Sequence, residues 1–211
     1  MIRAAALISG DGSKLQSILD ALYFSKLPEL ELVAAISPEK DSNAMKRALS
    51  FNIPTFVVDP ELFPNMTSHS MAVANKLKDM DIDLVILAGY KLELGVIPFQ
   101  YRNRIIGTYP SLIPTFAEVP DGDIFRAALE RGLKITGATA YFADSDGTVG
   151  NIILQKAVQI LPDDTPESLS RRILEEAEWV LLPEAVSLYC QGRLSVHGNR
   201  VLIREKIEAE K

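Results

Sequence analysis

The sequence predicts an α/β protein with a twisted, mostly parallel sheet, helices on both faces of that sheet, and antiparallel strands added in the C-terminal half. Three observations lead to this prediction. Short apolar runs typical of buried strands alternate with segments of helical periodicity through the first half of the chain. A glycine-containing turn follows the first apolar run. In the second half, two apolar runs are joined by a short polar turn, as in neighbouring antiparallel strands.

Hydrophobic spacing and turn residues define each element of the first half. Residues 2–9 form an apolar run that ends in a glycine-containing turn. Leu15, Ile18, Leu19 and Leu22 then recur at i, i+3, i+4 and i+7, which predicts a helix. By the same criteria we expect strands at 30–36, 55–58, 83–87 and 104–108, and helices at 44–50 and 71–80.

The second half departs from simple alternation. We expect a helix at 124–131, then strands at 135–142 and 152–158 around a polar turn at 144–147. Thr165, followed by Pro166, is a helix-start signal, and this helix is expected to run toward Gly192 with a kink at Pro183. The tail, 193–204, is expected to form a hairpin that turns at residues 198–199. Because no linker or repeat interrupts the chain, we predict one domain over residues 1–211.

Composition narrows the classes of partner. The 211 residues carry 22 Lys and Arg against 28 Asp and Glu, a net charge of −6, and no basic block is present, so nucleic acid is not an expected partner. The longest apolar runs are far shorter than the roughly 20 residues that cross a bilayer, so neither a transmembrane helix nor a membrane partner is expected. Residues 9–12 interrupt the apolar start before a signal sequence could form, which favours a cytoplasmic protein.

Cysteine and histidine are too scarce for the common metal sites. A single cysteine, Cys190, excludes an intramolecular disulfide and is expected to be a small, buried apolar residue. The two histidines, His69 and His197, are far apart and lack a carboxylate at ligand spacing, so no metal is expected. We expect both histidines at the surface.

The turn after the first strand has the features of an anion site. Backbone N–H groups and the helix dipole favour an anion there, and Ser13 and Lys14 could each contact a terminal phosphate. A dinucleotide fingerprint would need a glycine where Leu15 stands and an acidic residue at the end of the second strand, so NAD is not expected. The alternative is a tight turn that needs glycine only for its backbone.

Several blocks, in order and in register, resemble glycinamide ribonucleotide formyltransferases. They are Ile8-Ser9-Gly10-Asp11-Gly12-Ser13-Lys14-Leu15-Gln16, residues 83–90, Tyr109-Pro110-Ser111-Leu112-Ile113-Pro114, residues 137–139, 153–157 and 178–183, and Gln191-Gly192-Arg193-Leu194. The resemblance implies the Rossmann-like formyltransferase fold. It also implies folate-dependent transfer of a formyl group from 10-formyltetrahydrofolate to phosphoribosylglycinamide, a step of purine biosynthesis, and a possible homodimer.

The resemblance also implies which residues bind the two substrates. The phosphorylated substrate would be bound by Gly10, Asp11, Gly12, Ser13, Lys14 and Glu178. The pterin of the folate would be bound by backbone groups of Tyr90, Lys91, Leu92, Glu93 and Leu94. Within that segment, the Met-Arg-Ile usual in the family is Lys91-Leu92-Glu93 here, which introduces two charges into an apolar wall.

The chain departs from the family at the residues that carry the chemistry. The family uses Asn, His and Asp, and these positions correspond here to Gly107, Tyr109 and Thr148, while another family histidine corresponds to Tyr141. Losing one oxyanion donor costs about 10²–10³ in rate, and a positioned general acid contributes about 10²–10⁴. We therefore expect slow formyl transfer unless other groups compensate.

Three residues are candidate substitutes. Tyr109 could donate a hydrogen bond, and Asp144 or Asp146 could occupy the vacant carboxylate position, either by loop movement or because the alignment shifts by two residues. The competing interpretations are a packed aromatic for Tyr109 and turn formation for the two aspartates. At the level of the whole protein, the alternatives are a catalytically silent paralogue that binds a phosphorylated metabolite as a regulator or partner, and a different reaction in the same cleft.

Overall fold

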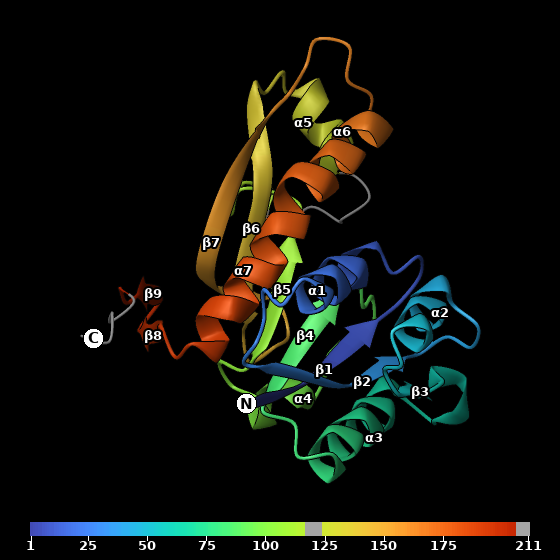
Figure 1. Ribbon diagram of the computed structural model, residues 1–211. Helices are drawn as coiled ribbons and strands as arrows, with labels where there is room; N and C mark the ends of the chain where they lie inside the picture. Colours follow the sequence, from blue (N-terminus) through green and yellow to red (C-terminus); the bar gives the residue numbers. More distant parts are fainter. Residues whose placement is uncertain (117–123, 206–211) are drawn as a thin grey trace.

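The computed structural model describes residues 1–116 and 124–205 and contains a seven-stranded sheet with the order β3-β2-β1-β4-β5-β6-β7 (Figure 1). The strands that pair in parallel are β1 (Ile2–Ile8), β2 (Leu30–Ser37), β3 (Thr55–Val57), β4 (Leu84–Ala88) and β5 (Ile105–Tyr109). Two long strands, β6 (Ile135–Ala143) and β7 (Val149–Gln159), extend the sheet in antiparallel fashion. The predicted fold class is confirmed.

Helices cover both faces of this sheet and define two hydrophobic cores. One face packs against α1 (Ser13–Tyr23), α2 (Asn43–Ser50), α5 (Ile124–Glu130), α6 (Pro166–Ile173) and α7 (Trp179–Cys190). The other packs against α3 (Met66–Asp79) and α4 (Ile97–Gln100). Ile8 faces the first core and Leu7 the second, and both are fully buried. The central strands are therefore apolar on both sides, as in parallel sheets generally.

The strand order places a crevice at the carboxyl ends of β1 and β4. From β1 the chain proceeds outward through β2 and β3, with the short 3₁₀-helix Pro60–Leu62 between β3 and α3, and then returns to β4 on the other side of β1. Ligands of open α/β sheets bind where the strand order reverses in this way. The loop from β1 to α1 lies at this point.

Helix α3 begins five residues before the predicted start at residue 71. Its first residue is Met66, because the Asn65 side chain caps the helix by accepting a hydrogen bond from the Ser68 N–H. The apolar periodicity used for the prediction marks only the later part of the helix, although His69 and Ser70 before it are also buried.

The long helical segment after β7 is irregular at a different place from the predicted kink. Pro183 lies inside α7, whereas residues Leu174–Glu178 form a π turn between α6 and α7 in which the Trp179 N–H bonds to the Leu174 carbonyl. The π turn ends before α7 begins, so the irregularity does not coincide with Pro183. Glu178, the last residue of this turn, is 4% exposed and is directed into the fold. Such turns are frequent at functional sites.

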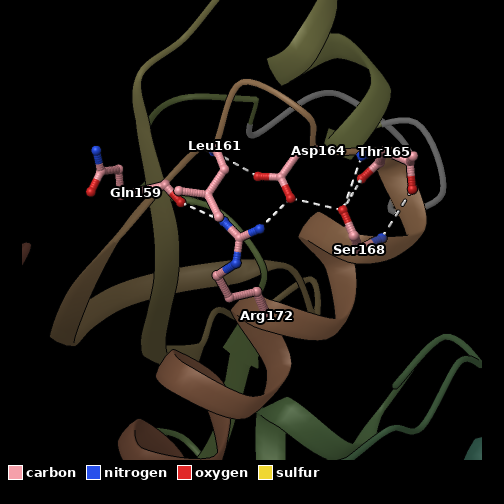
Figure 2. Close-up of polar contacts among 6 residues, drawn as sticks. All are labelled: Gln159, Leu161, Asp164, Thr165, Ser168 and Arg172. Carbon is pink, nitrogen blue, oxygen red and sulfur yellow. Dashed lines mark hydrogen bonds and ion pairs between the residues drawn. The ribbon is translucent and has the colours of Figure 1, made fainter.

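A polar clasp fixes the start of α6 to the end of β7 (Figure 2). Arg172 pairs with Asp164 and donates to the Gln159 carbonyl, while Asp164 also accepts hydrogen bonds from the Leu161 N–H and the Ser168 hydroxyl. Burial alone would raise the pKa of Asp164, but these hydrogen bonds and the Arg172 charge together hold that pKa below its usual range. The clasp therefore joins the loop after β7 to α6 through both Ser168 and Arg172.

The tail forms the predicted hairpin. Strands β8 (Leu194–His197) and β9 (Arg200–Ile203) pair antiparallel around residues 198–199 and lie beside β7 (Figure 1). Within residues 1–116 and 124–205, no helix has the length and apolar character required to cross a membrane.

Candidate active site

A cleft of about 420 Å³ opens at the crevice between β1, β4 and β5. Its walls are the loop after β1, the end of β4 with the residues that follow it, and the ends of β5 and β6. The lining residues are Ser9, Gly10, Asp11, Ser13, Lys14, residues 87–91, Thr108, Tyr109 and Tyr141. The structure thus brings the predicted anion loop, part of the predicted folate segment and Tyr109 to one place.

The loop after β1 takes the shape that its glycines permit. Gly10 and Gly12 have φ angles of 65° and 73°, and Gly12 is the residue that precedes α1. A Cβ at Gly12 would stand 2.6 Å from the Cα of Ala44, so this position requires glycine both for its backbone and for its space. The eleven-residue helix α1 therefore begins directly after this loop, and Ser13 and Lys14 of its first turn line the cleft.

Two backbone N–H groups of this loop donate hydrogen bonds to carboxylates. Asp11 Oδ1 accepts hydrogen bonds from the Ser13 N–H at 3.1 Å and from the Ser13 hydroxyl at 3.0 Å. Glu39 Oε2 accepts from the Gly10 N–H at 3.2 Å. The donors therefore favour anionic oxygens, as expected at a helix N-terminus.

Lys14 makes a contact that the sequence did not reveal. Its Nζ lies 2.6 Å from Glu178 Oε1 and 3.4 Å from the Thr108 carbonyl oxygen, and the Thr108 hydroxyl donates to the same carboxylate oxygen at 2.8 Å. Glu178 is not among the residues that line the cleft, although Lys14 and Thr108 are. The Glu178 carboxylate therefore holds the Lys14 ammonium group without lining the cleft itself, and Lys14 supplies the positive charge at the cleft wall.

At the end of β5 and on β6, tyrosines stand where the family resemblance places polar catalytic side chains. Gly107 pairs directly with Tyr141 in the antiparallel register, and Tyr109 is two residues farther along the same strand. Tyr109 is half-buried, and its hydroxyl donates to the Phe116 carbonyl at 2.9 Å. Of these tyrosines, only Tyr109 was a candidate catalytic group in the sequence analysis, whereas the structure puts Tyr141 at the cleft as well.

The structure does not bring Asp144 or Asp146 to the cleft. Both are exposed in the turn between β6 and β7, which also contains Thr148. Asp146 Oδ1 accepts from the Thr148 hydroxyl and N–H, and these hydrogen bonds lower the pKa of Asp146. The Asp144 carbonyl accepts from the Gly147 N–H. In this structure both aspartates shape the turn, the competing interpretation that the sequence had left open.

Only part of the predicted folate segment, residues 90–94, lines the cleft. Tyr90 and Lys91 line the cleft, and burial raises the pKa of Tyr90 to about 12. Leu92 is half-buried and Glu93 is exposed, while Leu94 is 4% exposed and belongs to the second core. Only the first two of the five residues therefore face the cleft.

Neither histidine lies at the cleft, and the expectation that His69 is at the surface is wrong. His69 is fully buried on α3, where a ring nitrogen lies 2.8 Å from the Val58 carbonyl oxygen and the ring packs edge-on against Phe63. It is buried because α3 starts earlier than predicted and turns this position toward the sheet. His197 is exposed, as expected. Cys190 is half-buried, and burial raises the pKa of its thiol to about 12.

No cluster of three or more His, Cys, Asp or Glu side chains that could hold a metal ion exists within the described parts of the chain. Four cleft residues lie in sequence blocks that resemble the family but were not predicted as site residues: Ser9, Leu87, Ala88 and Gly89. Ser9 immediately precedes the anion loop, and this adjacency was the available signal. Thr108 was also not singled out, although it stands between the two positions that had been compared with the family.

Comparison with known proteins gives consistent matches over nearly the whole chain. The formyl transferase family model matches residues 2–186. Phosphoribosylglycinamide formyltransferase from Haemophilus influenzae is 30% identical over 200 residues, which are 94% of this chain and 92% of that protein. The crystal structure of glycinamide ribonucleotide transformylase 1 from Symbiobacterium toebii superposes with a TM-score of 0.91 at 39% identity, covering 97% of this chain and 95% of that one.

A further relative is much longer than this chain. The trifunctional purine biosynthetic protein adenosine-3 of Drosophila pseudoobscura pseudoobscura is 35% identical over 195 residues, which are 91% of this chain but 14% of that protein. The chain thus spans about one seventh of that relative. Taken with the fold and the cleft, these matches show that the chain belongs to the formyl transferase family.

Proposed function

We propose that this chain transfers the formyl group of 10-formyltetrahydrofolate to the amine of phosphoribosylglycinamide, and that it does so in the cytoplasm as a step of purine biosynthesis. The observation that carries this proposal is the loop at the switch point of the sheet. Its Gly10 and Ser13 donors already bind carboxylate oxygens, and Lys14 adds a positive charge at the same wall of the cleft. This is the arrangement that a phosphate monoester requires.

The phosphate would replace two carboxylates at this loop. Asp11 is exposed and can turn away, which frees the N–H and hydroxyl of Ser13, and the Gly10 N–H can exchange Glu39 for a phosphate oxygen. Lys14 would then neutralise part of the phosphate charge while Glu178 holds its ammonium group in position. Tyr90 and Lys91 also line this cleft, and the folate would lie against them.

The reaction forms one carbon–nitrogen bond and breaks another. The substrate amine attacks the formyl carbon, the electron pair of the carbonyl moves to oxygen, and the tetrahedral intermediate collapses by expelling the folate nitrogen. The amine loses one proton and the folate nitrogen gains one. Among the described residues that line the cleft there is no histidine, and Asp11 is the one carboxylate. We expect a rate about 10²–10⁴ below that of a site with a positioned acid or base.

A second candidate function is binding of a phosphorylated metabolite without turnover. It is favoured by the same departures from the family: Gly107 and Tyr109 on β5, and the aspartates that remain in the turn after β6. Such a protein would act as a sensor or as a partner of an active enzyme. It would bind phosphoribosylglycinamide with an affinity that depends on the phosphate.

Steady-state kinetics with both substrates test the proposal. We expect turnover above the uncatalysed rate with phosphoribosylglycinamide and much less with the riboside that lacks phosphate. Ser13→Ala removes one hydroxyl donor and should raise KM more than it lowers kcat, whereas Ser50→Ala, on the exposed end of α2, serves as the matched control. Binding of the phosphorylated ligand in calorimetry without any turnover would establish the second function instead.

A further inference from the structure

Helix α2 contacts the loop after β1 through two consecutive carbonyl groups of that loop. The Gly10 carbonyl accepts a hydrogen bond from the Ala44 N–H at 3.1 Å. The Asp11 carbonyl accepts one from Arg47 Nε at 2.9 Å. A Cβ placed on Gly12 would stand 3.0 Å from Arg47 Cδ, so the stem of the arginine lies directly against the loop. Both carbonyls therefore point toward α2.

The direction of these carbonyls decides the direction of the N–H groups that follow them. In a trans peptide bond, the carbonyl of one residue and the N–H of the next point to opposite sides. The peptide bonds after Gly10 and Asp11 are trans, so the N–H groups of Asp11 and Gly12 point away from α2. Gly12 stands between Asp11 and Ser13, which both line the cleft, and the described residues of the cleft wall include none from α2. The two N–H groups thus point to the side of the loop on which the cleft lies.

The Arg47 guanidinium also holds the first turn of α1. Its Nη1 donates to Gln16 Oε1 at 2.9 Å, and Gln16 Nε2 donates in turn to Asp20 Oδ1 at 2.8 Å. Arg47 is half-buried. One planar group therefore bonds on both sides of Gly12, to Asp11 before it and to Gln16 after it. A lysine has a single nitrogen and cannot reproduce this pair of contacts.

We propose that Arg47 is a positioning residue for the phosphate of phosphoribosylglycinamide. It holds the peptide between Asp11 and Gly12 in the orientation that directs the Gly12 N–H, together with the donors of Ser13, at a phosphate oxygen. This inference rests on the proposed function and names a residue outside the cleft on which its phosphate affinity depends. Arg47 is not among the residues that line the cleft, so it acts through the loop.

Arg47→Met tests the proposal because it keeps an aliphatic stem beside Gly12 and removes both donors. Binding is measured by titration, followed in amide NMR spectra of isotope-labelled protein. We expect phosphoribosylglycinamide to bind about tenfold more weakly, and the riboside that lacks phosphate to change by less than about twofold. Lys46→Met removes an equal charge from an exposed neighbour on α2 and, as the matched control, should change both affinities by less than about twofold.

Two results of this titration would overturn the proposal. An equal loss for both ligands in Arg47→Met would show that the arginine supports the fold as a whole rather than the phosphate donors. The Gly12 amide resonance should move downfield when phosphoribosylglycinamide binds to the original protein, and much less in Arg47→Met. An equal movement in both proteins would show that the orientation of this N–H does not depend on Arg47.

Arg47→Lys separates orientation from charge. It retains the positive charge but provides one nitrogen in place of the two that reach Asp11 and Gln16. We expect it to bind phosphoribosylglycinamide about three- to fivefold more weakly than the original protein. Full affinity in Arg47→Lys would assign the whole effect to charge and would refute the positioning role.

Turnover measured on the same proteins separates this inference from the proposed function. Arg47→Met should raise KM for phosphoribosylglycinamide about tenfold while kcat stays within about twofold, because the loop contacts the phosphate and not the reacting atoms. If the original protein shows no turnover but the loss of affinity still depends on the phosphate, the proposed function fails and the positioning role stands. Turnover with an equal loss for both ligands leaves the function standing and refutes the role of Arg47.

Discussion

Replacing Lys14 by methionine removes the cation that faces Glu178 and leaves a carboxylate whose side chain is 5% exposed. Removing one partner from a buried ion pair costs about 3–5 kcal/mol, because the remaining charge is left uncompensated. The Lys14 side chain is 22% exposed and the Thr108 hydroxyl still donates to the carboxylate, which reduces the loss. We therefore expect Lys14→Met to lower the free energy of unfolding by about 2–3 kcal/mol.

Two further variants measure the coupling between Lys14 and Glu178. Glu178→Gln keeps an oxygen for the Thr108 hydroxyl and leaves Lys14 facing the cleft, so it should cost about 1–2 kcal/mol. The double variant Lys14→Met/Glu178→Gln has no buried charge at this place and should cost less than the sum of the two, with a coupling of about 2 kcal/mol.

Urea unfolding followed by circular dichroism at pH 7 measures all four free energies. Additive losses, within about 0.5 kcal/mol, would refute the reasoning, because two groups 2.6 Å apart and mostly buried must interact. In the same series, the variants that lack Lys14 should bind phosphoribosylglycinamide more weakly, whereas Glu178→Gln retains the cation and should lose less affinity.

Three further changes test other parts of the structure. Asp11→Asn removes a negative charge from the anion loop while keeping an oxygen for Ser13, and it should tighten binding of phosphoribosylglycinamide about fivefold in calorimetry; weaker binding would mean that the carboxylate is not a competitor. Gly12→Ala combines a positive φ with a 2.6 Å approach to Ala44 and should lower the free energy of unfolding by more than about 2 kcal/mol. Gly10→Ala also has a positive φ but open space around it, and should lower this free energy by about 1 kcal/mol. Equal losses in urea unfolding would count against the close approach of Gly12 to Ala44. Asp164→Asn should lower the free energy of unfolding by about 2–3 kcal/mol at pH 7. This loss should shrink below about pH 4, because a carboxylate with a lowered pKa stabilises the fold only while it is ionised. A loss that does not change with pH would exclude the clasp as its source.

The sequence was sufficient for the sheet because its central strands are buried on both sides. Runs such as residues 4–8 and 84–88 are apolar on both faces, as is typical of inner strands of a parallel sheet. The glycines of the loop after β1 could also be interpreted in advance, because a tight turn between a strand and a helix needs residues that tolerate a positive φ, whereas the contact of Gly12 with Ala44 is visible only in the structure. Sequence rules are sufficient where the local backbone conformation alone decides which residue can stand at a position.

The errors concern features that depend on distant contacts. His69 was expected at the surface because only part of its helix has an apolar pattern, and its burial depends on the Asn65 cap and on Val58. The pairing of Lys14 with Glu178 joins residues 164 positions apart through a π turn that no sequence rule predicts. Tyr141 was not among the predicted site residues, and its place at the cleft follows from the register that sets β6 against β5.

The most direct test of the account follows a labelled formyl group. The purified chain is incubated with phosphoribosylglycinamide and 10-formyltetrahydrofolate carrying an isotopic label in the formyl carbon, and the ribonucleotide is analysed by mass spectrometry over time. We predict that the label appears on the ribonucleotide faster than it does without protein, and that it appears more slowly with the riboside that lacks phosphate. Label that stays on the folate at the uncatalysed rate, while phosphoribosylglycinamide still binds, would contradict it.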